Sequence, residues 1–350
     1  MMFPFGVKEV FRGGLPIDGL AVSLDTENLR QFMQACDRPF EEFEIGKYRD
    51  ALFEFGMQRL VEEIGLPDAD IRALFQEVHG HFFGLPGVSL DSYAMQGDRV
   101  YAHMHTLFPT HEQWWRVQHK GILEEKGIKV PRPLRGISPT FVDSMVITGD
   151  NQTVLGVRTH QSEGAGEIMV APAGGIEYKK PGRDQEIIMD TVRSETRDEI
   201  GLNPEMYTPT LIGIIHDGAI AYGDGFTFAL RTQLTFESLR DAHRFAYSVQ
   251  VPIMQGLEAY GMDIGSARRE SHETIREWND AIARGDHIPT LPPSVQKPIL
   301  PNDAWEHSEL IGLPLDQDTL AAFLQLESVN GHRILEETKG IVYMAQQYLH

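Results

Sequence analysis

The stretch from Ala171 to Leu202 reads A-P-A-G-G-I-E-Y-K-K-P-G-R-D-Q-E-I-I-M-D-T-V-R-S-E-T-R-D-E-I-G-L. Its second half carries the signals of a short helix, since Asp184 can cap the N-terminus and Gly201 stands where a left-handed residue is favoured. A stripe of residues suited to burial recurs at every fourth position, at Ile188, Val192, Thr196 and Ile200. The stretch therefore predicts a glycine-containing loop followed by an amphipathic helix.

Three acidic residues lie close together near the end of this predicted helix. Glu195 and Glu199 are four residues apart, and Asp198 lies beside them. Like charges at this spacing destabilise a helix by roughly a few tenths of a kcal/mol per pair. A hard divalent cation bound among the carboxylates would make the cluster favourable. We expect Glu199 on the face opposite the apolar stripe, so that Glu199→Gln would leave the fold intact.

Carboxylates on a helix after a Gly-Gly turn resemble the signature of the Nudix hydrolases, G-x5-E-x7-R-E-U-x-E-E-x-G-U, where U is bulky and apolar. The matching positions are Gly175, Glu186, Glu195, Glu199, Gly201 and Leu202, with Asp198 as a conservative match. The chain departs from the pattern at Ser194, where the family has arginine, and at Thr196, which is less apolar than expected. The segment between Gly175 and Glu186 is also five residues longer than in the pattern.

The departure at Ser194 bears on activity, because the arginine of the family pairs with a metal-binding glutamate and orients it. Arg193 is one position away and is rotated by about 100° around the helix, so it is poorly placed to substitute, as is Arg197. Three alternatives stay open: a distant residue replaces the arginine, activity is weak, or the domain binds a ligand without cleaving it. A solvated acidic helix with ordinary caps is the alternative without a functional site.

The resemblance implies a fold and a chemistry. The fold is α/β: a Nudix-type α/β/α sandwich with a mixed sheet, plus an N-terminal mostly helical region. Mg²⁺ or Mn²⁺ is expected at Glu195, Asp198 and Glu199, and these three are also the expected catalytic residues. A backbone carbonyl near Ala173 is expected to add a ligand. The residues expected to contact the substrate are Gly174, Gly175 and Glu186.

The expected substrate is a small-molecule nucleoside diphosphate derivative in which the diphosphate is linked to another moiety. The phrase P-A-G-G-I-E, from Pro172 to Glu177, is similar to the loop of Nudix pyrophosphatases that act on ADP-ribose-like compounds. One of the three carboxylates, or a later acid in the segment from His216 to Gly218 or at Asp224, would act as the base. A simple hairpin turn explains that later segment equally well. The alternative function is a non-catalytic module that binds a nucleotide or a partner protein.

Composition narrows the classes of partner. The 350 residues are 41% hydrophobic and carry a formal charge of −20, so binding to nucleic acid or to an anionic membrane is not expected. A single cysteine, Cys36, excludes an internal disulfide and favours a reducing compartment. The sequence shows no signal peptide and no run of ~20 apolar residues, so we expect a cytoplasmic protein, with a homodimer as one option.

Three regions are expected along the chain. Residues 1–130 form a mostly helical region of unknown role, which ends at the Pro131-Arg132-Pro133 stretch. Residues 134–290 form the Nudix-like domain, and residues 291–350 form a Pro-rich linker and C-terminal helices. The strands expected in the middle region are 142–148, 154–159, 168–171, 211–215, 226–234 and 248–252.

Histidines in the first region form two H-x-H pairs. His79 and His81 flank a glycine, while His103 and His105 flank a methionine. Two histidines at this spacing on a strand lie on one face, as a metal site requires. No third ligand follows at a recognisable spacing, so we favour ordinary half-buried histidines.

Overall fold

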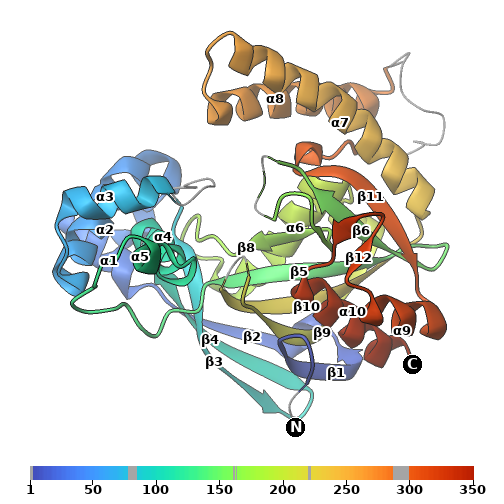
Figure 1. Cartoon of the computed structure of the whole chain (residues 1–350), viewed down its shortest axis with the longest axis horizontal. Helices are drawn as coiled ribbons and strands as arrows, with labels where there is room; N and C mark the ends of the chain where they lie inside the picture. The colour runs from blue at the N-terminus through green and yellow to red at the C-terminus, as the bar shows by residue number, and fades with distance from the viewer. Residues whose placement is uncertain (1–2, 78–84, 161, 163, 220–221, 287–298) are drawn as a thin grey trace.

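An eight-stranded mixed sheet lies at the centre of the molecule (Figure 1). The structure is a computed structural model, and it describes residues 3–77, 85–160, 162, 164–219, 222–286 and 299–350. The strand order is β1-β9-β10-β5-β6-β11, with β8 paired to β5 and β7 paired to β6. Among the described strands of this sheet, β5 and β10 pair in parallel, and the other neighbouring strands pair antiparallel. The predicted α/β class with a mixed sheet is therefore confirmed.

Most of the strands expected in the middle region are present with shifted ends. The strands of the large sheet are β1 (Val7–Leu15), β5 (Thr140–Ile147), β6 (Gln152–Arg158), β7 (Ile168–Val170), β8 (Ala173–Gly175), β9 (Tyr207–Asp217), β10 (Gly223–Thr232) and β11 (His307–Pro314). Both β5 and β10 are buried along nearly their whole length, which explains why their sequences are apolar without a strict alternation.

Helices cover both faces of the sheet. Val142 and Val146 of β5 face α6 (Ile187–Ile200), while Met145 and Ile147 of the same strand face α10 (Glu336–Leu349). These directions follow from the alternation of side chains along a strand. The sheet thus lies between two separate hydrophobic cores.

The sheet opens between β5 and β6. These strands pair at Ile147 and Thr153 and then separate, with β8 alongside β5 and β7 alongside β6. The chain passes from β7 to β8 through Ala171 and Pro172. Because the two strand pairs diverge here, side chains from both faces of the sheet can reach one space.

The N-terminal region contains more strand than the sequence predicted. Its helices are α1 (Glu27–Ala35), α2 (Ile45–Ile64), α3 (Asp68–Glu77), α4 (Pro109–His119) and α5 (Ile122–Glu125). A second sheet, of order β2-β4-β3, is formed by β2 (Leu20–Asp25), β3 (Gly87–Gln96) and β4 (Arg99–Leu107). The helical lobe lies beside the large sheet in Figure 1, with the three-stranded sheet between them. Since β1 pairs with β9, the first residues of the chain belong to the large sheet.

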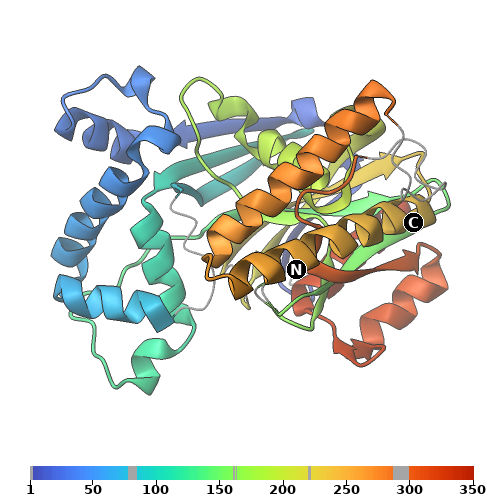
Figure 2. The same ribbon diagram turned by 90° about the horizontal axis from the view of Figure 1, so that it is seen from above.

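The C-terminal region also differs from the prediction. Residues 248–252, expected as a strand, lie inside the helix α7 (Phe236–Ala259), where Ala242, Ala246, Gln250 and Met254 are buried at every fourth position. The next helix, α8 (Ile264–Arg284), runs alongside α7 (Figure 2). The region 291–350 is not a linker followed by helices alone, because β11 completes one edge of the large sheet. Much of the proline-rich segment, 287–298, lies outside the described residues.

The remaining elements close the second core. They are α9 (Gln317–Gln325), a two-stranded ribbon of β12 (Ser328–Val329) and β13 (His332–Arg333), and α10. Within the described part of the chain, no helix has both the length and the apolar character needed to cross a membrane.

Candidate active site

The helix α6 carries the acidic cluster. Gly201 follows its last residue with φ = 72°, which confirms the predicted left-handed C-terminal residue. The predicted cap at Asp184 is wrong, because Asp184 starts a short 3₁₀ turn and α6 begins three residues later, at Ile187. The predicted stripe is confirmed, since all four of its residues are at most 1% exposed: Ile188, Val192, Thr196 and Ile200.

Glu199 does not lie opposite the stripe. At about 100° per residue, eleven steps from Ile188 bring Glu199 to within about 20° of that residue. The structure agrees, since Glu199 is 2% exposed. The expectation that this carboxylate is on a free helix face is therefore corrected.

The strand β8, which carries Gly174 and Gly175, lies against the helix α6. The backbone N–H of Ala173 donates to Oε1 of Glu199 at 3.4 Å. A side chain at Gly174 would collide with the carboxyl group of Glu195, whereas Gly175 has open space around it. Glycine at position 174 therefore allows the carboxylate of Glu195 to lie directly against β8.

These groups line a cavity of about 300 Å³ that we call the acidic cavity. It lies at the opening between β5 and β6 and is bordered by α4 of the N-terminal region. Among the described residues, its acidic lining comprises Glu112, Asp143, Glu177, Glu195, Glu199, Asp217, Asp303, Glu306 and Glu337. Its basic lining comprises Arg116 and Arg158. The lining thus contains nine carboxyl groups and two guanidinium groups. When the carboxyl groups are ionised, a bound cation would be attracted to this cavity.

Burial and crowding act on the two glutamates of α6. Burial raises the pKa of Glu195 well above its usual value, and the charges of Glu306, Asp303, Glu177 and Asp198 add to the effect. Burial likewise raises the pKa of Glu199, with Glu306 and Glu195 contributing and Arg158 opposing. Both groups would ionise more readily with a cation nearby.

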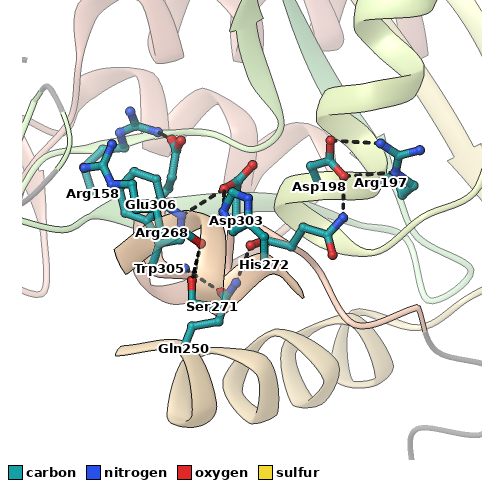
Figure 3. A network of polar contacts seen from close by, with 11 residues as sticks. Arg158, Arg197, Asp198, Gln250, Arg268, Ser271, His272, Asp303, Trp305 and Glu306 are labelled. Carbon is teal, nitrogen blue, oxygen red and sulfur yellow. Dashed lines mark hydrogen bonds and ion pairs between the residues drawn. The ribbon is translucent and has the colours of Figure 1, made fainter. Parts of the chain in front are cut away.

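Two acids missed by the sequence analysis come from the turn η5 (Ala304–Glu306) and the residue before it. Asp303 and Glu306 line the acidic cavity, and Glu306 accepts from Arg158 of β6 at 2.6 Å. Figure 3 shows both acids beside the polar residues of α7 and α8 that surround this turn. Trp305 donates from Nε1 to Asp303 at 2.9 Å, and its ring lies under the guanidinium of Arg268 at 3.9 Å. The sequence did not indicate these two acids, because residues 303–306 lie in no periodic hydrophobic pattern that would predict a helix or a strand.

Asp198 points to a different space. Its carboxylate pairs with Arg197 at 2.9 Å and accepts from Asn302 at 2.9 Å. It lines a second, polar cavity of about 600 Å³ with His272 and Asp303, and it is not part of the lining of the acidic cavity. The structure therefore separates Asp198 from Glu195 and Glu199, although Asp303 reaches both spaces.

A further group of acids lies on the opposite side of the acidic cavity. Asp143 of β5 and Glu337 of α10 are both buried, and burial is the main cause that raises the pKa of each carboxyl group. Burial first, and then the charge of Asp217, raise the pKa of Asp143 to about 8, while the contact with Glu337 opposes the rise. This group therefore holds a proton near neutral pH.

Other predicted site residues lie elsewhere. Glu186 is exposed and pairs with Arg183 and Arg193, so it does not line the acidic cavity. Asp224 pairs with His216 at 2.9 Å and Lys8 at 2.5 Å, an arrangement that links β9, β10 and β1.

The histidine pairs of the N-terminal region have two different outcomes. His79 and His81 lie outside the described residues. His105 pairs with Asp91 at 2.7 Å, on the three-stranded sheet.

The donor chemistry of the acidic cavity fits a hard divalent cation, since carboxylate oxygens are the ligands that Mg²⁺ and Mn²⁺ prefer. Across residues 3–77, 85–160, 162, 164–219, 222–286 and 299–350, no three acidic, histidine or cysteine side chains form a ready coordination group. A cation would therefore have to draw Glu195 and Glu199 together with a neighbour such as Glu306.

Comparisons with known proteins leave the family open. No family model matches the chain, and no curated protein matches it. Among solved structures, 28% of the chain aligns with the crystal structure of DR0079 from Deinococcus radiodurans, at 12% identity and a TM-score of 0.23. The aligned part spans 57% of that protein, and a similarity this small carries no argument.

Proposed function

We propose that this protein is a metal-dependent Nudix-type hydrolase that cleaves the diphosphate bond of a nucleoside diphosphate linked to another moiety. The observation that carries the proposal is the acidic cavity itself, with nine carboxyl groups and two arginines. A diphosphate enters such a space only together with cations. The position of α6 and α10 on opposite faces of the sheet supports the finer fold, a Nudix-type α/β/α sandwich.

In this proposal Glu195 and Glu199 bind Mg²⁺ or Mn²⁺, and Glu306 completes the set in place of Asp198. The bound cation would neutralise the diphosphate and lower the pKa of a water molecule. Gly174 lets the loop approach the helix, so that the backbone of residues 173–175 faces the same space. Arg158, paired with Glu306, adds a positive charge beside this set. An ADP-ribose-like or nucleotide-sugar substrate is the class proposed.

A substrate panel tests the proposal. The purified full chain is incubated with ADP-ribose, NADH and nucleotide sugars, with Mg²⁺, Mn²⁺ or EDTA, and the released nucleoside monophosphate is quantified. We expect metal-dependent release from at least one compound, and a roughly thousandfold loss in Glu199→Gln, since several kcal/mol of transition-state stabilisation disappear. Absence of turnover on every compound would reject the hydrolase.

The second candidate is a module that binds a nucleotide or a partner protein without cleaving it. The observations that favour it are Ser194 in place of the family arginine and, within the part of the chain that the structure describes, the absence of a three-group coordination arrangement. Tight, metal-independent binding of a nucleoside diphosphate compound without turnover would establish this function instead.

A further inference from the structure

Glu199 has a buried partner that comes from a distant part of the chain. His307, the first residue of β11, is 0% exposed, and its Nε2 lies 3.0 Å from Oε2 of Glu199. The other oxygen of Glu199 accepts from the backbone of Ala173. Within the described residues, the two oxygens of Glu199 thus contact groups from two elements that lie far apart in sequence. Together these contacts fix the orientation of the carboxylate.

The neighbourhood of His307 is built to hold its ring in this place. On the paired strand β6, Gly156 leaves room that a side chain would take from the imidazole. His243 of α7 lies on another side, with its ring centre 6.4 Å away. Within the described residues, Nδ1 of His307 has no hydrogen-bond partner. The ring therefore makes its hydrogen bond through Nε2, to Glu199.

The helix itself supplies no cation to Glu199. Ser194 donates its hydroxyl to the backbone of Thr191, within its own turn. The guanidinium of Arg193 contacts Asp190, and that of Arg197 contacts Asp198. The orientation of Glu199 is therefore set from outside α6.

We propose that His307 is the positioning residue of this site: its Nε2–H orients the carboxylate of Glu199 for a divalent cation. The proposal rests on the function proposed above, in which Glu199 binds the cation. In this arrangement β11 completes the site by carrying His307. Metal binding then depends on Gly156, which leaves room for the His307 ring.

Two variants that differ by one methylene group test the contact. The amide of His307→Gln can reach the place of Nε2, whereas the amide of His307→Asn ends short of Glu199. Outer partners of metal ligands contribute about 10–100-fold in metal affinity or activity. We expect His307→Asn to weaken Mn²⁺ binding, measured by calorimetry with the metal alone, by about that factor, and His307→Gln to stay within about threefold of wild type.

The control for a general effect of losing a buried imidazole is His111→Asn, since His111 is also buried and its Nε2 contacts Glu63 rather than Glu199. It should leave Mn²⁺ affinity unchanged. In the Glu199→Gln background, His307→Asn should have no further effect on Mn²⁺ affinity, because the two residues act through one contact. With substrate, His307→Asn should lower kcat while KM for substrate stays within about twofold.

Equal Mn²⁺ affinity in His307→Asn and wild type would overturn the proposal, as would equal losses in His111→Asn and His307→Asn. Absence of Mn²⁺ binding by wild type would overturn it too. If wild type binds Mn²⁺ but shows no turnover, the hydrolase fails, while the affinities of the Gln and Asn variants still decide the role of His307.

Discussion

At the scale of single residues, Gly174 and Gly175 are expected to respond differently to substitution, because Gly174 alone of the two lies against Glu195. A methyl group at position 174 would collide with the carboxyl of Glu195, while position 175 is open. We expect Gly174→Ala to lower metal-dependent turnover by about 10–100-fold because the carboxylate is displaced. Gly175→Ala should stay close to wild type. Steady-state kinetics with circular dichroism checks the pair, and equal activity of both variants would contradict the placement of Glu195.

The buried carboxyl group of Asp143 gives a pH dependence at the same scale. The pKa of Asp143 is raised to about 8, mainly by burial, so its neutral form favours the fold. That stability is fully present below the unfolded pKa of about 4 and is lost as pH rises through about 8. The free energy of unfolding of Asp143→Asn should therefore exceed that of wild type by about 1 kcal/mol or more above pH 8, and the two values should be equal near pH 4. Urea titrations in EDTA at both pH values measure this, and a larger gap at pH 4 would reverse the sign.

At the scale of elements, α7 holds the turn that carries Asp303 and Glu306. Gln250 is 0% exposed, accepts from the backbone of Trp305 at 3.2 Å and donates to the carbonyl of Asn302. Gln250→Leu would leave these buried groups unpaired, at a cost of about 1–3 kcal/mol each. We expect a lower melting temperature and reduced turnover. Gln255→Leu, at an exposed position of the same helix, should change neither, and identical behaviour of the two variants would rule out this anchoring.

Local patterns explain which elements the sequence predicted. The stripe of α6 and the apolar runs of β5 and β10 are continuous, so their secondary structure could be read directly. The strand β11 alternates weakly and follows a proline-rich segment, so it was missed, and His307 and Glu306 were missed with it. Sequence spacing and a conservative match to the Nudix pattern placed Asp198 in the cluster, yet its carboxylate contacts Arg197 and Asn302 instead. Pairing and register of distant strands place the cavity, and no local pattern records them.

At the scale of the whole molecule, the boundary at Pro131-Arg132-Pro133 remains a prediction. Because β1 pairs with β9, a cut at this boundary is not expected to release two independent fragments. Limited proteolysis should cut near Pro131. Since Val7 to Leu15 pairs with β9, the two fragments should elute together in native buffer and separate only in denaturant. Gel filtration of the nicked protein measures this, and separate elution in native buffer would contradict the pairing of β1.

The position of β1 also matters while the chain is being made. Val7 pairs with Ile215, 208 residues later (215 − 7), so at about 5–20 residues per second the strand waits ~10–40 s for its partner to leave the ribosome. During that interval its backbone is open to other chains. The charges of Lys8, Glu9 and Arg12 lie along it, and charged side chains on an unpaired strand discourage wrong association. The charged residues of β1 thus keep this strand solvated until β9 is available to pair with it.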